Sequence, residues 1–212
     1  MVEVPIERLV DSWPEGFLRA VAEETDAAFA QAFRVATDTV DFPERKHQLG
    51  HLRHALTERA LRSAATAAGL STHVPDTVPK GSCYSVVEKN GIFLIRSNVL
   101  SHCGMPRPTR FRERWARLNE WMSPTQIDLF EPTFDPPRDM VCAMLVITAA
   151  KHGDPTVPAF VGIGVPSACL STWLALEPLE KLIARYHTTA TPKAAEPPLK
   201  DRATPKLKRR GG

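Results

Sequence analysis

The sequence has little of what marks a secreted, membrane-bound or zinc-binding protein. Its four cysteines are far apart and form no Cys-x-x-Cys pair, so a cysteine-based zinc site is not indicated, and a chain of 212 residues does not require a disulfide framework. The first residues lack a charged-then-apolar signal pattern, and no apolar run approaches the roughly 20 residues that span a bilayer. We therefore expect a reduced, cytoplasmic protein with no membrane segment.

Cofactor and catalytic motifs are missing as well. Gly162 and Gly164 have no third glycine and no following lysine, so they favour a twist or close packing over a phosphate loop. His102 and Cys103 are neighbours, and neighbours in an extended chain point apart, so they indicate a loop cysteine rather than a nucleophile and its base. The sequence predicts no cofactor, assigns no catalytic residue and leaves open whether the protein is an enzyme.

Charge is abundant but segregated. Residues 1–42 carry nine acids and three bases, whereas residues 43–122 carry six acids and thirteen bases. Residues 123–190 carry seven acids and four bases, and residues 191–212 carry two acids and seven bases. A basic middle and a basic tail on an otherwise acidic chain indicate a polyanion or an acidic protein surface as partner.

The clearest local signal is a β-hairpin in the middle of the chain. Two β-rich runs, 83–89 and 92–97, flank Asn90-Gly91, and this dipeptide is favoured in type I′ turns because both residues tolerate positive φ. A second hairpin is predicted from strand 141–147 and its partner 157–165. Helical periodicity predicts four helices, over 15–41, 43–68, 109–122 and 171–187.

These elements predict an α+β fold. Two N-terminal helices pack on an antiparallel sheet of two β-hairpins, and each hairpin is followed by a helix. The predicted domain organisation is an N-terminal helical arm (1–69), a body of two hairpin–helix units (70–187) that begins with a linker (70–81), and a disordered basic tail (188–212).

The second predicted helix carries a polar stripe with the spacing His-x3-His-x2-His-x3-Glu. Its members are His47, His51, His54, Glu58 and Arg62, and the opposite, apolar face holds Leu49, Leu52, Leu56, Ala60 and Ala67. Because side chains at i and i+4 can reach one ion, the spacing is also that of a helical metal-ligand ladder. The simplest interpretation is a solvated face, and a third is contact with phosphates or a partner. We take the three histidines as candidate nucleic-acid or partner-binding residues and assign no metal ligand.

The third predicted helix carries an arginine stripe. Thr109 is its predicted N-cap, and its apolar side is formed by Phe111, Trp115, Leu118 and Met122. Along another face, basic residues recur at i, i+3, i+7 and i+10: Arg107, Arg110, Arg114 and Arg117. Guanidinium groups bind phosphate oxygens in bidentate fashion, so the stripe predicts a nucleic-acid or partner-binding surface. The alternative is a solvated face that pairs with acids elsewhere, for example on the acidic N-terminal helix.

The order of these elements is a hairpin, an arginine-rich helix with Arg117-Leu118-Asn119, a crossover with Asp128-Leu129-Phe130, and a second hairpin. This order resembles that of a family of uncharacterised proteins. These are actinobacterial and prophage proteins encoded beside Xre-type regulators that carry an ImmA/IrrE-like peptidase domain, and the resemblance covers roughly residues 45–170. It implies a toxin–antitoxin or phage-response module with a regulator of that type as partner. It assigns no catalytic residues.

We therefore expect an interaction protein of a bacterial or phage regulatory or defence module. It would bind a protein partner, and nucleic acid is a second candidate, through the basic arginine-rich surface. The alternative is a metal-dependent nuclease-type toxin, because a hairpin strand carries Glu88-Lys89 between helices. These two residues are adjacent, however, and would point to opposite faces of the strand. A small-molecule sensor is a third hypothesis, and the sequence does not determine the oligomeric state.

Overall fold

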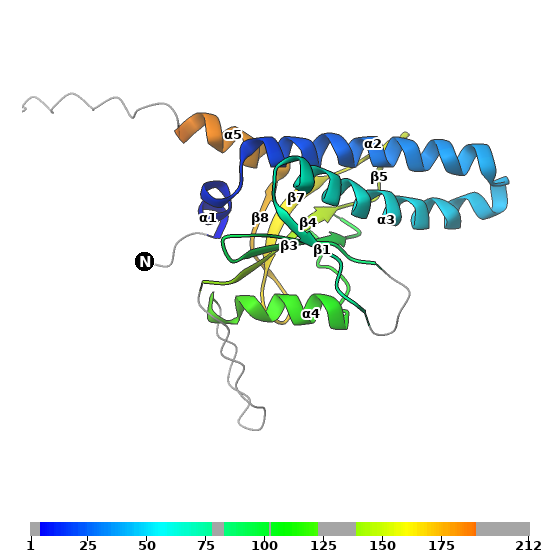
Figure 1. Cartoon of the computed structure of the whole chain (residues 1–212). Coiled ribbons are helices and arrows are strands. Elements are labelled where there is room, and N and C mark those ends of the chain that lie inside the picture. The colour runs from blue at the N-terminus through cyan, green and yellow to red at the C-terminus, as the bar shows by residue number, and fades with distance from the viewer. Residues whose placement is uncertain (1–4, 78–82, 102, 123–138, 190–212) are drawn as a thin grey trace, which may run out of the picture.

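The computed structural model describes residues 5–77, 83–101, 103–122 and 139–189, which form three layers (Figure 1). Helices cover one face of a six-stranded sheet: α1 (Pro5–Ser12), α2 (Glu15–Thr39), α3 (Phe42–Ala67) and α5 (Leu179–Thr189). The opposite face carries α4 (Arg110–Ala116), which continues as the 3-10 helix η1 (Arg117–Met122). The α+β class and the two long N-terminal helices packed on a sheet are confirmed.

Three predicted features lie outside the described residues: the crossover at 123–138, His102, and the tail from residue 190 onward. Among the described residues, no helix combines the length and the hydrophobicity that a membrane span requires.

The strands of the sheet pair in the order β1-β2-β3-β4-β7-β8. They are β1 (Ser71–His73), β2 (Val86–Lys89), β3 (Ile92–Asn98), β4 (Val141–Ile147), β7 (Val161–Pro166) and β8 (Trp173–Pro178). A separate two-stranded ribbon pairs β5 (Ala150–Lys151) with β6 (Asp154–Pro158) and lies along the connection from β4 to β7.

The central hairpin forms as predicted. β2 and β3 pair in antiparallel register from Val86 with Ile95 to Lys89 with Ile92. The turn residues Asn90 and Gly91 have φ angles of 51° and 75°, the left-handed geometry that a type I′ turn requires. A side chain at Gly91 would also lie 2.6 Å from the Asp139 carbonyl oxygen. This position therefore requires glycine both for its positive φ and for lack of space.

The prediction of an all-antiparallel sheet is wrong. β3 and β4 pair in parallel, from Ile92 with Val141 to Asn98 with Ile147, so the sheet is mixed. The connection between them passes through α4 and η1 on one face of the sheet, and parallel neighbours need such a crossover because a tight turn can only reverse the chain. The second predicted pairing holds, because β4 and β7 are antiparallel.

Two other segments differ from the prediction. The predicted linker contains β1, which adds a strand to the edge of the sheet beside β2. The region predicted as one helix, 171–187, contains strand β8, which ends at Pro178, followed by helix α5, which begins at Leu179. The rings of Phe160 and Trp173 lie where side chains of Gly162 and Gly164 would be, at 2.5 and 2.6 Å from ideal Cβ positions. The two glycines therefore serve close packing, one of the two roles expected of them.

Side chains alternate between two cores across the sheet. Leu94 and Leu145 point toward α2 and α3, whereas Ile95 and Met144 point toward α4. All four are fully buried, and each such side chain contributes about 1.5–3 kcal/mol of transfer free energy to folding. The continuously apolar stretch of β3 is explained by its place between two covered faces.

Asn119 on η1 joins the α4 layer to the sheet. Its buried amide accepts a hydrogen bond from the Cys142 N–H (2.8 Å) and donates to the Cys142 and Pro166 carbonyl oxygens (2.9 and 2.7 Å). Pro166 ends β7 and has no N–H, so it cannot donate to the Cys142 carbonyl oxygen. The side chain of Asn119 completes the backbone pairing instead.

Candidate functional site

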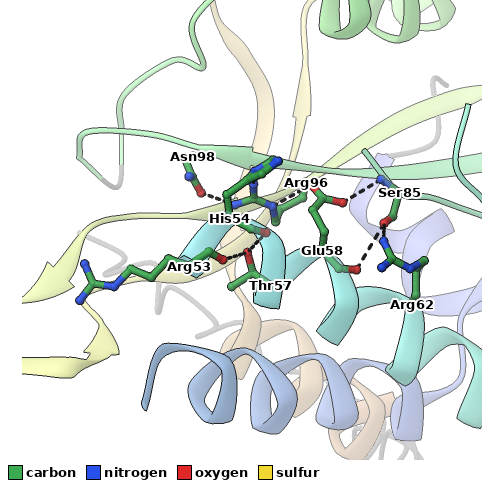
Figure 2. A network of polar contacts seen from close by, with 8 residues as sticks. All are labelled: Arg53, His54, Thr57, Glu58, Arg62, Ser85, Arg96 and Asn98. Carbon is green, nitrogen blue, oxygen red and sulfur yellow. Dashed lines mark hydrogen bonds and ion pairs between the residues drawn. The ribbon is translucent and has the colours of Figure 1, made fainter. Parts of the chain in front are cut away.

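Several elements meet at the edge of the sheet where β3 ends. Arg96 and Asn98 end β3, Ser85 immediately precedes β2, and α3 places His54 and Glu58 over both strands (Figure 2). Ligands in α/β sheets commonly bind outside the carboxyl ends of parallel strands, and β3 belongs to the parallel pair. The carboxyl end of β3 is therefore where a functional site would be expected.

A buried ion pair forms its centre. Arg96 Nε donates to Glu58 Oε1 at 2.9 Å, and the two residues are only 3% and 2% exposed. The second carboxylate oxygen, Oε2, accepts the Ser85 backbone N–H at 2.7 Å. Moving two charges out of water is costly, and a buried pair is tolerated only when further hydrogen bonds satisfy both groups.

The remaining guanidinium nitrogens of Arg96 are also bonded. Nη1 donates to Asn98 Oδ1 at 2.6 Å, and Nη2 donates to His54 Nδ1. Arg62, one turn along α3 from Glu58, donates from Nη1 to Ser85 Oγ at 2.6 Å. The network therefore fastens α3 to β2 and β3 through side chains that are nearly all satisfied, and we interpret it as structural.

His54 is held neutral within this network. Burial lowers the pKa of His54, and the adjacent Arg96 guanidinium lowers it further, while Glu58 and a hydrogen bond with the Cys83 backbone oppose the shift. Because a guanidinium can only donate, Nδ1 must accept, and the proton of the neutral ring lies on Nε2. Protonation of His54 would remove the acceptor and place a second positive charge beside Arg96.

Aromatic rings connect this network to α4. His54 lies edge-on to Tyr84 (5.6 Å between centroids), and Tyr84 stacks on Phe111 at 4.6 Å. Arg112 points inward beside them: its Nη1 donates to the Arg107 carbonyl oxygen at 2.9 Å, and burial lowers its pKa. Its buried Nε has no hydrogen-bond partner among the described residues.

The solvated-face interpretation of the histidine stripe is wrong for its second half. Glu58 is buried and His54 and Arg62 are half-buried, whereas His47 and His51 are exposed near the start of α3. The predicted apolar face is shifted as well: Leu49, Leu52 and Leu56 are half-buried and Ala67 is exposed. The buried residues of α3 are Thr57, Glu58, Ala60, Leu61, Ala64 and Ala65. The stripe therefore divides into an exposed histidine pair and a buried polar cluster.

The predicted stripe is a solvent-facing surface, which we call the arginine face (Arg107, Arg110, Arg114 and Arg117). Arg110 and Arg114 lie on α4, Arg107 precedes this helix and Arg117 begins η1. All four residues are exposed, and none of them forms an ion pair with another described residue. The acidic helix α2 lies on the other side of the sheet (Figure 1), so the alternative in which these arginines pair with the acidic N-terminal helix is wrong. Thr109 caps α4 as predicted by accepting the Arg112 N–H at 3.3 Å.

The remaining candidates are the Glu88–Lys89 pair and the cysteines. Glu88 and Lys89 are half-buried neighbours on β2 and therefore point to opposite faces. Within the described ranges, no three His, Cys, Asp or Glu side chains lie close enough to share a metal ion. All four cysteines are free, and burial raises the pKa of Cys142.

Comparison with protein-family models, with curated proteins and with solved structures gives no match for this chain.

Sequence reasoning missed Arg96, Ser85, Tyr84 and Arg112 as members of the cluster. One signal was available for Arg96: it directly follows the apolar run 92–95, so a charged side chain in a buried strand required a carboxylate partner. No signal identified Ser85, because its backbone N–H and its hydroxyl meet residues of α3 that are more than 20 positions away along the chain. Chemically, the cluster holds the fold, and the arginine face is free to bind an anion.

Proposed function

We propose that this protein is a binding protein that holds an anionic macromolecule, with nucleic acid as the first candidate, on the arginine face of α4. The observation that carries the proposal is the exposure of all four arginines together with the lack of an ion-pairing acid among the described residues. Guanidinium groups that form no ion pair need not break one before a phosphate binds. Each can form a bidentate pair with a phosphate.

The length of the arginine face fits a few phosphates. Arg110 and Arg117 are seven residues apart, which corresponds to about 10 Å along a helix. The acids nearest in sequence are Glu113 and Glu120. They are outnumbered by the four arginines of the face and the neighbouring Arg112, so this segment has a net positive charge. Contacts to phosphates orient a protein without reading the bases, so we expect binding that depends weakly on sequence and strongly on salt.

The resemblance to proteins encoded beside Xre-type regulators supports a role in a bacterial or phage regulatory or defence module. In such a module, the partner on the arginine face would be nucleic acid or an acidic surface of a regulator with an ImmA/IrrE-like domain. We place nucleic acid first because guanidinium groups at helical spacing match phosphate groups without needing a folded, complementary surface. No described feature favours the nuclease alternative.

The test is fluorescence anisotropy with short labelled single-stranded DNA, duplex DNA and RNA, at salt concentrations between about 50 and about 200 mM. The variant R110A/R114A/R117A should bind all three more weakly, and the slope of log K against log salt should become shallower by about 2 to 3 units. A control variant, R34A/R59A/K151A, removes three exposed cations from other elements and should bind like the wild type.

Equal weakening in the two variants would reduce the effect to net charge and contradict a localised surface. Binding of none of the three nucleic acids at the lower salt concentration would overturn the nucleic-acid assignment. An acidic protein partner would then be tested with the same two variants.

A further inference from the structure

The end of the α2–α3 hairpin projects beyond the sheet, on the side of the molecule away from α4 (Figure 1). His47 and His51 stand there one turn apart on α3, and both are exposed. The Nε2 atoms of the two rings are 3.2 Å apart, and the ring planes meet at 75°. The two rings therefore bring the same nitrogen atom of each histidine close together.

This separation suits chelation of a metal ion. Two imidazole nitrogens bound at about 2.0–2.1 Å to one zinc ion, with an angle between about 90° and 110°, lie about 2.9–3.4 Å apart. In the free protein the same distance is a hydrogen bond between the two rings. To bind a metal, the donating ring moves its proton to Nδ1, which leaves both Nε2 lone pairs available.

The surroundings leave room for an ion and its water ligands. The pair lines an open hollow together with Pro43, Lys46 and Gly50. Gly50 has no side chain, and apart from its chain neighbours and the adjacent helix backbone no atom lies within 4 Å of the position that a Cβ would occupy there. The Lys46 ammonium disfavours cation binding, because it brings a positive charge to the rim of the hollow.

We propose that His47 and His51 form a chelating pair for a divalent transition-metal ion of the zinc, nickel or copper class. Imidazole ligands suit these ions, whereas magnesium and calcium require oxygen ligands. Two protein ligands leave further coordination positions for water or for a group from another molecule. The proposal is independent of the arginine face, which lies on another element.

The experiment is isothermal titration calorimetry of the full chain with ZnCl₂ and, separately, with NiCl₂. The wild type should bind about one equivalent of each ion, and MgCl₂ should give no binding. H47Q and H51Q should each weaken binding about tenfold or more, because a single imidazole loses the chelate effect. K46Q should bind more tightly than the wild type, because it removes the competing charge.

Two control variants test whether metal binding depends on the His47–His51 pair rather than on the number of histidines in the chain. H152Q removes an exposed histidine from another element and should bind like the wild type. K46H/H47Q keeps the number of histidines but places them five residues apart, where they no longer share one face, and should bind as weakly as H47Q. All altered residues are exposed, so the variants should fold, and circular dichroism verifies this. Metal binding that H47Q and H51Q leave unchanged, or no binding of either ion, would overturn the proposal.

Discussion

Glu58 on α3 and Arg114 on α4 are both charged residues of amphipathic helices that pack on the same sheet. Glu58 is 2% exposed and meets Arg96, whereas Arg114 is exposed and meets no acid among the described residues. The two helices differ in what lies beneath them. α3 crosses the end of β3, where a second charge is already buried. α4 packs through aromatic rings that leave Arg110 and Arg114 outside.

The comparison shows that a helical stripe of charges has no fixed meaning. The buried cluster is bonded on nearly all sides by groups of the described chain, so we expect its main effect to be on the stability of the fold. The arginine face is exposed and forms no ion pair among the described residues, so we expect it to contribute little to folding and to remain available for binding. Substitutions in the two regions should therefore change different measurements.

The largest effect is expected for Glu58→Ala. It leaves Arg96 charged, buried and without its carboxylate, which typically costs about 3–5 kcal/mol of unfolding free energy. Urea denaturation followed by circular dichroism measures this loss. Arg59→Ala, an exposed neighbour on the same helix, should change the free energy by less than about 0.5 kcal/mol.

The double change Glu58→Leu and Arg96→Met sharpens the same point. Replacing both charges by apolar groups of similar size removes the desolvation cost together with the attraction, so it should recover most of the stability lost in Glu58→Ala. A double variant that is no more stable than Glu58→Ala would show that the loss came from packing or from the lost hydrogen bond with the Ser85 N–H, rather than from the unpaired charge.

A smaller and pH-dependent effect is expected at His54. Its pKa in the folded protein is lowered from the ordinary value of 6.5, mainly by burial, so between the two values the unfolded chain binds more protons. Stability contributed by neutral His54 is therefore present above about pH 6.5 and is lost as the pH falls toward the folded pKa.

The variant His54→Asn isolates this contribution, because an amide oxygen can accept from Arg96 but cannot titrate in this range. Melting temperatures measured from pH 7.5 to pH 5 should fall more steeply for the wild type than for the variant. Parallel curves for the two proteins would contradict the role assigned to His54.

The smallest effect on stability is expected from the arginine face. The variant R110A/R114A/R117A should unfold within about 1 kcal/mol of the wild type, because exposed, unpaired side chains contribute little to folding. Thermal melting at low salt measures it. A loss comparable with that of Glu58→Ala would mean that these arginines have structural partners and would remove the contrast between the two regions.

Local signals predicted much of the fold. The Asn90-Gly91 turn fixed the central hairpin, Thr109 marked the start of α4, and proline after Phe42 marked the start of α3. Each of these features depends on the chemistry of one or two residues and their immediate backbone, which a single sequence displays directly.

Long-range choices could not be predicted in the same way. The direction of β4 relative to β3 depends on whether the intervening segment returns to the end of the sheet where β3 began, and the sequence does not record this. Residues 173–178 contain Trp173, Leu174 and Leu176, a spacing compatible with a helix or a strand, and pairing with β7 decides for the strand.

The candidate sites were predicted in part. Spacing identified the arginine face and the histidine stripe, because both are helical patterns. It could not show that Glu58 faces a buried Arg96 that lies 38 residues away along the chain. That distinction depends on tertiary packing, which turns one half of the stripe inward.

One comparison tests the division of roles most directly: the melting temperature and the nucleic-acid affinity of R110A/R114A/R117A, measured on the same preparation. We predict an unchanged melting temperature, weaker binding and a shallower dependence of affinity on salt. A lower melting temperature with unchanged affinity would contradict the account, because the arginines would then belong to the fold and the binding surface would lie elsewhere.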